Sequence, residues 1–176
     1  MKHVRTWAPA ALLSAGCMAF AAPALACETT VGVVMSLTGP AGQYGQAGAK
    51  SVEMAFADIN EAGGANGCDL VTDSRDAQSQ GNVAVDQARQ LVNIKNVPVI
   101  IGGIISSVSI PILTSVTAPA KVVQVSPASS SPTLTQLARD GKTDGYFFRT
   151  ITSDALQGTA AAKYAVDSGL TKLAIV

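Results

Sequence analysis

Hydroxyl-bearing side chains gather in two short segments of the sequence, residues 102–107 (GGIISS) and 126–132 (SPASSSP). A serine hydroxyl can donate one hydrogen bond and accept two without carrying a charge. It becomes a nucleophile only when a neighbouring group takes its proton. Without such a base, these segments suit the binding of a small zwitterion or a neutral solute.

A base for these serines is hard to find in the sequence. The one histidine is His3, in an N-terminal segment that we expect to be cleaved. Its loss excludes Ser-His-Asp and Cys-His nucleophiles and the usual zinc sites, and the spacing of Asp58, Asp73 and Asp76 does not match a calcium loop. We therefore predict that the protein is not an enzyme and uses no metal or cofactor. An exported enzyme with a lysine-assisted serine is the alternative.

Nucleotide binding is a second alternative, because dinucleotides bind where glycines follow the first strand of a βαβ sheet. Here those glycines are Gly39, Gly42, Gly45 and Gly48. Their three-residue spacing differs from G-x-G-x-x-G, and no G-x-x-x-x-G-K-[ST] occurs. The sequence therefore disfavours a nucleotide.

Residues 1–26 have the features of a signal peptide. Basic residues precede an uncharged stretch, no acidic residue occurs before Glu28, and residues 24–26 (ALA) form a small-x-small cleavage site. A membrane anchor is the alternative, but the apolar stretch is short and interrupted by prolines. We predict export to the periplasm with Cys27 as the first mature residue. Lipid attachment to Cys27 is the less favoured alternative, because the leucine usual three residues earlier is absent.

Cleavage changes both the charge and the cysteine count. It removes Lys2 and Arg5 from the 12 basic residues, which leaves 10 against 12 acidic ones and a net charge near −2. This balance argues against nucleic acid as a partner. Of the three cysteines, Cys27 and Cys68 remain, an even number in an oxidising compartment. We predict a disulfide between them, with two separate buried thiols as the alternative.

Short apolar runs alternate with stretches of helical period, which predicts an α/β fold with a doubly wound, mostly parallel sheet flanked by helices. Several runs lack polar alternation, as expected of strands buried on both faces. The predicted strands are residues 30–35, 70–72, 97–101, 122–125, 146–148 and 172–176. Helices are predicted after the first three strands, and another opens at Asp154. Residues 126–133 and 139–145 are predicted loops.

Ligands of doubly wound sheets bind beyond the carboxyl ends of the strands, where the strand order reverses. In the common order 2-1-3-4-5, this point lies between the first and third strands, and residues 102–107 follow the third. Ser106 and Ser107 immediately precede a helical stretch, so a serine cap and free N–H groups would seat a carboxylate. Gly102 and Gly103 would let a ligand approach the backbone. A plain helix cap without a ligand is the alternative.

Four motifs and their order resemble the periplasmic solute-binding proteins of ABC transporters, in the leucine/isoleucine/valine-binding group. The motifs are VGVVMSLTGPAGQYGQAGAKSVEMAFADINEAGGANG from residue 31, GGIISSVSIP from 102, VSPASSSPTLT from 125 and YFFRTITSDALQG from 146. The resemblance covers residues 30–176. It implies the periplasmic-binding-protein-like I fold, in which two α/β lobes close on an amino acid or related small carboxylate. It also implies a membrane permease as partner.

The resemblance implies seven ligand-binding residues: Tyr44, Ile104, Ile105, Ser106, Ala128, Ser129 and Ser130. The Ser106 hydroxyl and the main chain beside it would contact the carboxylate of the amino acid. The ammonium-side contacts fall on Ala128 and Ser130, and Tyr44 packs near the ligand. Ser130 stands where the amino-acid binders commonly have threonine, a change that keeps the hydroxyl.

Family members are considerably longer than this chain. We therefore predict that residues 27–149 are the N-terminal ligand-binding lobe, and that 150–176 are the crossover and the truncated start of a second lobe. The second lobe of the family supplies the acidic partner of the ammonium, so this chain alone should bind ligand weakly or not at all. A ligand-sensing module that reports to a membrane receptor is the alternative function, because the same fold serves both.

Overall fold

The computed structural model describes residues 27–174 of the chain. Five strands form one parallel sheet in the order β2-β1-β3-β4-β5. Their bounds are β1 (Glu28–Met35), β2 (Asp69–Asp76), β3 (Val99–Gly102), β4 (Val123–Ser126) and β5 (Phe147–Arg149). The order is the one that the sequence predicts, so the strand order reverses between the neighbouring strands β1 and β3.

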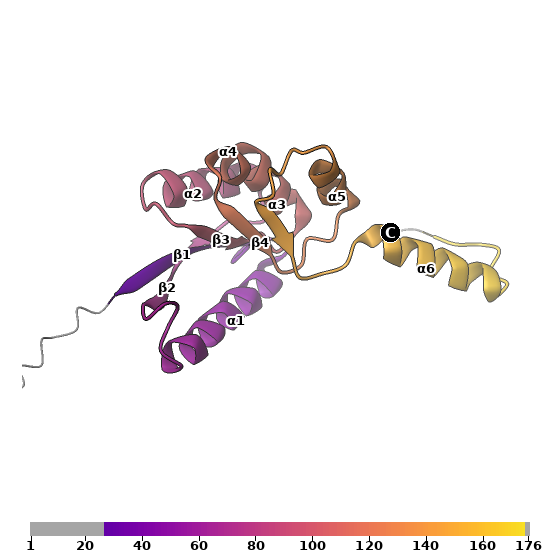
Figure 1. Ribbon diagram of the computed structural model, residues 1–176. Coiled ribbons are helices and arrows are strands. Elements are labelled where there is room, and N and C mark those ends of the chain that lie inside the picture. Colours follow the sequence, from indigo (N-terminus) through magenta and orange to yellow (C-terminus); the bar gives the residue numbers. More distant parts are fainter. Residues whose placement is uncertain (1–26, 175–176) are drawn as a thin grey trace, which may run out of the picture.

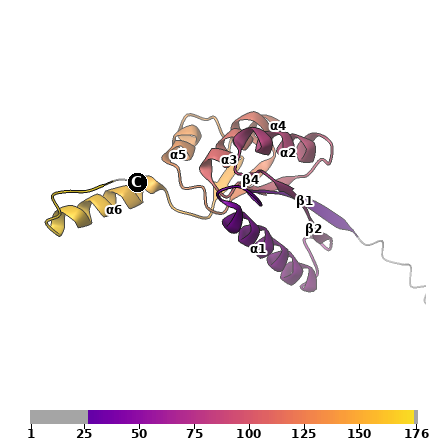
Figure 2. The ribbon, with the colours of Figure 1, turned by 180° about the vertical axis from the view of Figure 1, so that it is seen from behind.

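Helices cover both faces of the sheet (Figures 1 and 2). α1 (Gly42–Glu61) lies on one face, whereas α2 (Gly81–Asn93) and α3 (Ser106–Ile112) lie on the other. The alternation of side chains along β1 accounts for this, because successive residues of a strand point to opposite faces. Val33 and Met35 pack in the cluster under α1, and Val34 packs with α2 and α3. The predicted α/β fold class is confirmed.

The helix after β3 differs from the prediction at Pro111. The sequence predicts this proline near a helix start, where its missing N–H breaks no bond. Pro111 is instead the sixth residue of α3. A π-helical turn, η1 (Leu113–Thr117), and the short α4 (Ala118–Ala120) follow it. Insertions of this kind accommodate a disrupted helical ladder, and here they leave Leu113 buried.

Three further features of the structure differ from the prediction. β2 runs to Asp76 instead of ending at residue 72, because an edge strand can present polar residues to solvent. A helix that the sequence analysis does not assign, α5 (Pro132–Arg139), lies between the two predicted loops and overlaps the end of each, and the Ser131 hydroxyl caps it. Residues 172–174 do not form the predicted strand, since no described strand lies beside them to pair with; residues 175–176 lie outside the described part.

The last helix, α6 (Asp154–Asp167), opens at Asp154 as predicted, with Ser153 as its N-cap. It extends away from the sheet beyond β5 (Figures 1 and 2). Leu156 and Tyr164 of its apolar face are 65% and 71% exposed. Within residues 27–174, no layer of the sheet domain covers this face.

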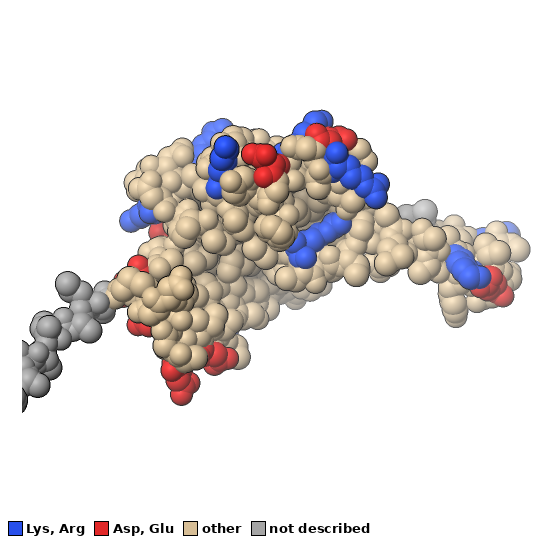
Figure 3. Space-filling view, viewed as in Figure 1, with Lys and Arg blue, Asp and Glu red and all other residues tan. Residues whose placement is uncertain are grey.

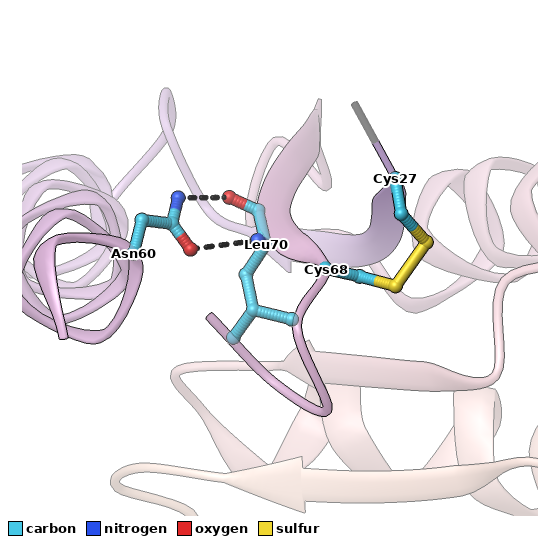
Figure 4. The surroundings of a disulfide bond; sticks show 4 residues. All are labelled: Cys27, Asn60, Cys68 and Leu70. Atoms are coloured by element: carbon cyan, nitrogen blue, oxygen red, sulfur yellow. Dashed lines mark hydrogen bonds between the residues drawn. A yellow bond between two sulfur atoms is a disulfide. The ribbon is translucent and has the colours of Figure 1, made fainter. Parts of the chain in front are cut away.

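The amino ends of β1 and β2 are joined covalently. The structure confirms the predicted disulfide between Cys27 and Cys68, whose Cα atoms are 4.5 Å apart (Figure 4). The bond is possible because β1 and β2 pair in register, with Glu28 opposite Asp69. Beside it, the Asn60 amide of α1 donates to the Leu70 carbonyl at 2.9 Å and accepts from the Leu70 N–H at 2.7 Å. Asn60 therefore occupies the free edge of β2 in the way that another strand would.

Charged side chains of both signs are interspersed on the face shown in Figure 3, with acidic groups at the C-terminal end of α1. Among residues 27–174, no helix has the length and hydropathy needed to cross a membrane. The predicted signal peptide, residues 1–26, lies outside the described residues.

Candidate ligand-binding site

An open pocket of about 410 Å³ lies where α1 meets the loops that follow β3 and β4. Its wall is mostly apolar. The lining residues are Tyr44, Ala47, Gly48, Ser51, Ile104, Ile105 and Ala128. Four of the residues that the sequence analysis singles out, Tyr44, Ile104, Ile105 and Ala128, therefore meet at one place. The Tyr44 side chain is 61% exposed, so its ring can contact a molecule held there.

Asp76 at the end of β2 holds the β1–α1 loop, which leads into α1 and so positions Tyr44 in the first turn of that helix. The Asp76 carboxylate accepts hydrogen bonds from the N–H groups of Leu37 (2.9 Å) and Thr38 (3.1 Å). It also accepts from the Thr38 hydroxyl at 2.6 Å and the Gln78 N–H at 2.8 Å. Burial raises the pKa of the Asp76 carboxyl, but these hydrogen bonds outweigh burial, so its pKa lies below the ordinary value.

Two glycines allow the β1–α1 loop to pack closely. A Cβ at Gly45 would collide with the backbone of Ser36, so α1 can begin directly against the end of β1. Gly39 has φ +81°, and a Cβ there would lie 2.6 Å from the Gln78 carbonyl oxygen. Only glycine fits both requirements at Gly39.

The loop after β3 rests on a buried polar network. The Gly103 carbonyl accepts from the hydroxyls of Ser109 (3.0 Å) and Ser126 (2.7 Å). The Gln124 side chain of β4 donates to the carbonyls of Gly102 (3.0 Å) and Ser109 (3.1 Å). Ser109, Gln124 and Ser126 are fully buried. Because buried polar groups are costly when unpaired, this network holds the loop in one position.

The prediction that Gly102 and Gly103 open the backbone to a ligand is wrong, because the space left by their missing side chains is filled by other atoms of the chain. A Cβ at Gly102, whose φ is +152°, would collide with the Val34 carbonyl of β1, and one at Gly103 would collide with Val108. Both glycines therefore serve the internal packing of β3 and α3.

The predicted serine cap before α3 is also wrong. The helix begins at Ser106, its N-cap is Ile105, and no side chain caps it. The Ile105 carbonyl accepts from the N–H groups of Val108 and Ser109, each at 3.0 Å. The N–H groups of Ser106 and Ser107 have no hydrogen-bond acceptor among residues 27–174. They remain as donors at the edge of the pocket.

The Ser106 hydroxyl accepts a hydrogen bond from the Ser131 N–H at 3.1 Å. This contact joins the start of α3 to the loop after β4. Because a backbone N–H can only donate, the Ser106 oxygen is the acceptor and its own proton stays available. Ser106 can therefore donate to a ligand, together with the N–H groups beside it.

The β4–α5 loop has one free carbonyl. Thr150 donates to the carbonyls of Ser126 (3.2 Å) and Pro127 (3.1 Å). The carbonyls of residues 129, 130 and 131 each accept a hydrogen bond as well. Ala128 is the exception: within the described chain no donor reaches its carbonyl. The Ala128 carbonyl is therefore the backbone group of this loop that can accept a hydrogen bond from a ligand.

Arg149 at the end of β5 holds this loop in place. Its guanidinium donates to the carbonyls of Ser129 (3.1 Å) and Ser131 (3.0 Å), and to the Thr135 hydroxyl at 2.7 Å. Arginine has five donors in a rigid fork and is always charged, so it can bind several oxygens at fixed positions. The two carbonyls flank Ser130, which is therefore fixed from both sides.

The serines of this loop differ in their surroundings. Ser129 is fully buried, and its hydroxyl lies 2.6 Å from that of Ser109 and 3.3 Å from the Gly103 carbonyl. Its side chain belongs to the interior network, and its N–H and carbonyl bond to the Ser126 hydroxyl and to Arg149. Ser130 is partly exposed and its hydroxyl donates to the Asp154 carboxylate at 2.8 Å.

Sequence reasoning does not identify the residues that position the site, namely Asp76, Gln124, Arg149 and Asp154. Asp76 is considered only as a metal ligand and Asp154 only as a helix start. The one available signal is that Arg149 and Asp154 lie in the motif YFFRTITSDALQG. Their partners are 14 to 24 residues away in the chain, so no local pattern predicts the contacts.

A larger hollow, about 650 Å³, lies between α5 and the start of α6. It is lined by helix-surface residues such as Gln136, Arg139 and Leu156. We place the site at the smaller pocket, because there the strand ends and the free hydrogen-bonding groups of two loops converge.

The chain is similar to known proteins over most of its length. Residues 28–176 match the family model described as "Periplasmic binding protein". The Leu/Ile/Val-binding protein of Citrobacter freundii is 36% identical over 159 residues, which are 88% of this chain and 41% of that protein. A chemotactic signal transduction system substrate-binding protein of Halobacterium salinarum is 32% identical over 78% of this chain and 33% of its own length.

Among solved structures, an ABC transporter substrate-binding protein from Desulfitobacterium hafniense in complex with Leu is similar, with a TM-score of 0.63 and 29% identity. The match covers 81% of this chain and 39% of that one. The chain thus spans about two fifths of the length of the proteins it resembles.

Proposed function

Because the chain belongs to the periplasmic binding protein family, we propose that it is part of an exported substrate-binding protein of an ABC importer for amino acids or related small carboxylates. One observation carries the proposal. Two neighbouring loops leave opposite hydrogen-bonding groups free beside one apolar pocket: donors at residues 106 and 107, and an acceptor at Ala128.

This arrangement matches the two ends of an amino acid. The carboxylate would accept from the Ser106 hydroxyl and the adjacent N–H groups, and the backbone at Ile104 and Ile105 would shape the seat. The ammonium would donate to the Ala128 carbonyl and to the Ser130 hydroxyl oxygen, and the buried Ser129 between them would hold both residues in place. Hydrogen bonds to charged groups are about twice as strong as neutral ones, which favours a zwitterion over a neutral solute.

The side chain of the ligand would lie along the apolar wall formed by Tyr44, Ile104 and Ile105. A branched aliphatic side chain suits such a wall, and the bacterial relative is named for leucine, isoleucine and valine. We therefore propose branched-chain amino acids as the first candidates.

Export to the periplasm and delivery to a membrane permease complete the proposal. The Cys27–Cys68 bond supports an oxidising compartment. A Cys27 sulfur in a disulfide is not available for a lipid thioether, so the bond also favours a soluble periplasmic protein over a lipoprotein. The proposed partners are a small-molecule ligand and a permease, without nucleic acid.

We propose that residues 27–149 are one ligand-binding lobe, and that residues 150–176 lead into a second. The sheet ends with β5 at Arg149, and α6 lies apart from it. Affinity in proteins that close around a ligand comes from burying it between lobes. The 27–176 chain should therefore bind amino acids only at millimolar concentration.

A titration of isotopically labelled residues 27–176, followed by NMR, tests the function. L-leucine should shift the backbone signals of residues 104–107 and 128–130, and a neutral sugar of similar size should not. Chemical shifts detect millimolar binding that calorimetry misses. If neither leucine, isoleucine, valine nor any other amino acid moves these signals, the proposal is wrong.

The sensing alternative has one observation in its favour, the name of the archaeal relative. Gene deletion separates the two functions. An importer component is needed for amino-acid uptake, whereas a sensing module is needed for chemotaxis and leaves uptake unchanged.

A further inference from the structure

Asp154 lies at the junction between the β4–α5 loop and α6, and it makes two hydrogen bonds to one residue. Its carboxylate accepts from the Ser130 hydroxyl at 2.8 Å, and its N–H donates to the Ser130 carbonyl at 2.9 Å. Asp154 occupies the first turn of α6, where the helix dipole favours a negative charge. The pair is thus held from both sides.

The contact with Asp154 determines where the proton of the Ser130 hydroxyl points. A hydroxyl has a single proton, and an ionised carboxylate can only accept. Ser130 must therefore donate to Asp154, and what it still offers to a ligand is oxygen lone pairs. The Ser130 carbonyl is already used by the Asp154 N–H, so the hydroxyl oxygen is the remaining acceptor of this residue.

Ser106 has the opposite assignment. Its oxygen accepts from the Ser131 N–H and its proton is free. Two hydroxyls of the same chemical type, on neighbouring loops, therefore present opposite polarity. The backbone N–H of Ser131 decides the polarity of the Ser106 hydroxyl. The side chain of Asp154 decides the polarity of the Ser130 hydroxyl.

We infer that Asp154 is a positioning residue that makes Ser130 specific for the ammonium end of the ligand. The inference rests on the proposed function and names a residue that contacts Ser130 instead of the ligand. Without the carboxylate, the Ser130 hydroxyl could rotate and donate its proton. It would then bind a carboxylate or a hydroxyl of a ligand as readily as an ammonium.

The site is well suited to a test, because the loop does not depend on Asp154 alone. Arg149 holds the carbonyls of Ser129 and Ser131, and Thr150 holds those of Ser126 and Pro127. In Asp154→Ala, the N–H at position 154 can still donate to Ser130. The substitution should therefore free the hydroxyl while the loop backbone stays in place.

The first measurement needs no ligand. Three-bond couplings between Hα and Hβ report the χ1 rotamer of Ser130 in labelled residues 27–176. They should indicate one rotamer in the unsubstituted chain and an average of several in Asp154→Ala. Asp167→Asn is the matched control, because Asp167 lies on the same helix but pairs with Lys163 at 2.7 Å. Equal couplings in the unsubstituted chain and Asp154→Ala would overturn the inference.

The second measurement compares leucine with 4-methylpentanoate, which has the same carbon skeleton and carboxylate but no ammonium. The dissociation constant of 4-methylpentanoate divided by that of leucine should fall about tenfold in Asp154→Ala, because one hydrogen bond with a charged partner is lost. The affinity for 4-methylpentanoate should not fall. Asp167→Asn should leave the ratio unchanged.

Asp154→Asn separates hydrogen bonding from charge. The asparagine oxygen can still accept from Ser130, so this variant should keep most of the discrimination. If Asn and Ala lower the ratio equally, the carboxylate acts through its charge alone and the inference is wrong. If the unsubstituted chain binds leucine but Asp154→Ala keeps the full ratio, the inference again fails and the proposed function stands. If the unsubstituted chain binds no amino acid, both fail.

Discussion

The two ends of the sheet are held in different ways. At the amino end, the Cys27–Cys68 bond joins β1 to β2, and the Asn60 amide pairs with both backbone groups of Leu70 at the edge of β2. At the carboxyl end, single side chains such as Asp76 and Arg149 hold whole loops, while Ala128 and the start of α3 keep free backbone groups. An end of the sheet that only stabilises the fold can pair all its hydrogen-bonding groups. An end that binds must leave some unpaired, so its loops need support from elsewhere.

Breaking the disulfide should give the largest effect and should be confined to the amino end. The bond closes a loop of 41 residues, so loop-closure entropy predicts a loss of about 4 kcal/mol in the free energy of unfolding. Urea denaturation with and without dithiothreitol measures it. The NMR signals of Ser106 and Ser130 should not move on reduction under native conditions. A loss of stability accompanied by large shifts there would contradict the separation of the two ends.

Arg149→Lys should act mainly on the carboxyl end. Lysine keeps the charge but cannot bind two carbonyls and a hydroxyl in a fixed fork. We expect about 1–2 kcal/mol less stability and loss of the leucine-induced shifts at residues 128–130. Arg139→Lys on α5, which is exposed, is the matched control and should change neither. Unchanged hydrogen exchange at residues 128–131 in Arg149→Lys would show that Arg149 does not hold the loop.

Asn60→Ala should weaken the amino end by about 1 kcal/mol, because it leaves the Leu70 N–H and carbonyl without their side-chain partner. Asn93→Ala, in α2 and exposed, controls for the higher helix propensity of alanine. Thermal unfolding of both variants measures the difference. Hydrogen exchange should rise at Leu70 and stay the same at Ser106 and Ser107; a rise at both ends would contradict the comparison.

Acidification should act on the carboxyl end alone, with the smallest effect. The pKa of Asp76 is lower in the folded chain than in the unfolded chain, so its contribution to stability is present above the unfolded value, about 3.9, and disappears as pH falls through the folded value. Asp76→Asn should therefore be less stable than the unsubstituted chain at neutral pH, and the gap should close in acid. A gap that stays constant from neutral pH through the acid range would contradict this role of Asp76.

Local patterns predict the fold class and the five strands of the sheet, with bounds that shift by a few residues. Strands such as 30–35 are continuous apolar runs, which is a short-range signal, and the strand order follows from the usual winding of such sheets. The predicted disulfide is correct because in-register pairing of β1 and β2 brings Cys27 beside Cys68. The predicted serine cap and the predicted role of Gly102 fail, because each depends on a neighbour from another strand or loop.

Residue types and their order are enough to predict the fold class and the pairing of the two cysteines. Which serine hydroxyl donates and which accepts depends instead on contacts that the folded chain makes. The polarity of Ser106 depends on the Ser131 N–H and that of Ser130 on the Asp154 carboxylate, each about 25 residues away in the chain. A hydroxyl can do either until the fold supplies its partner.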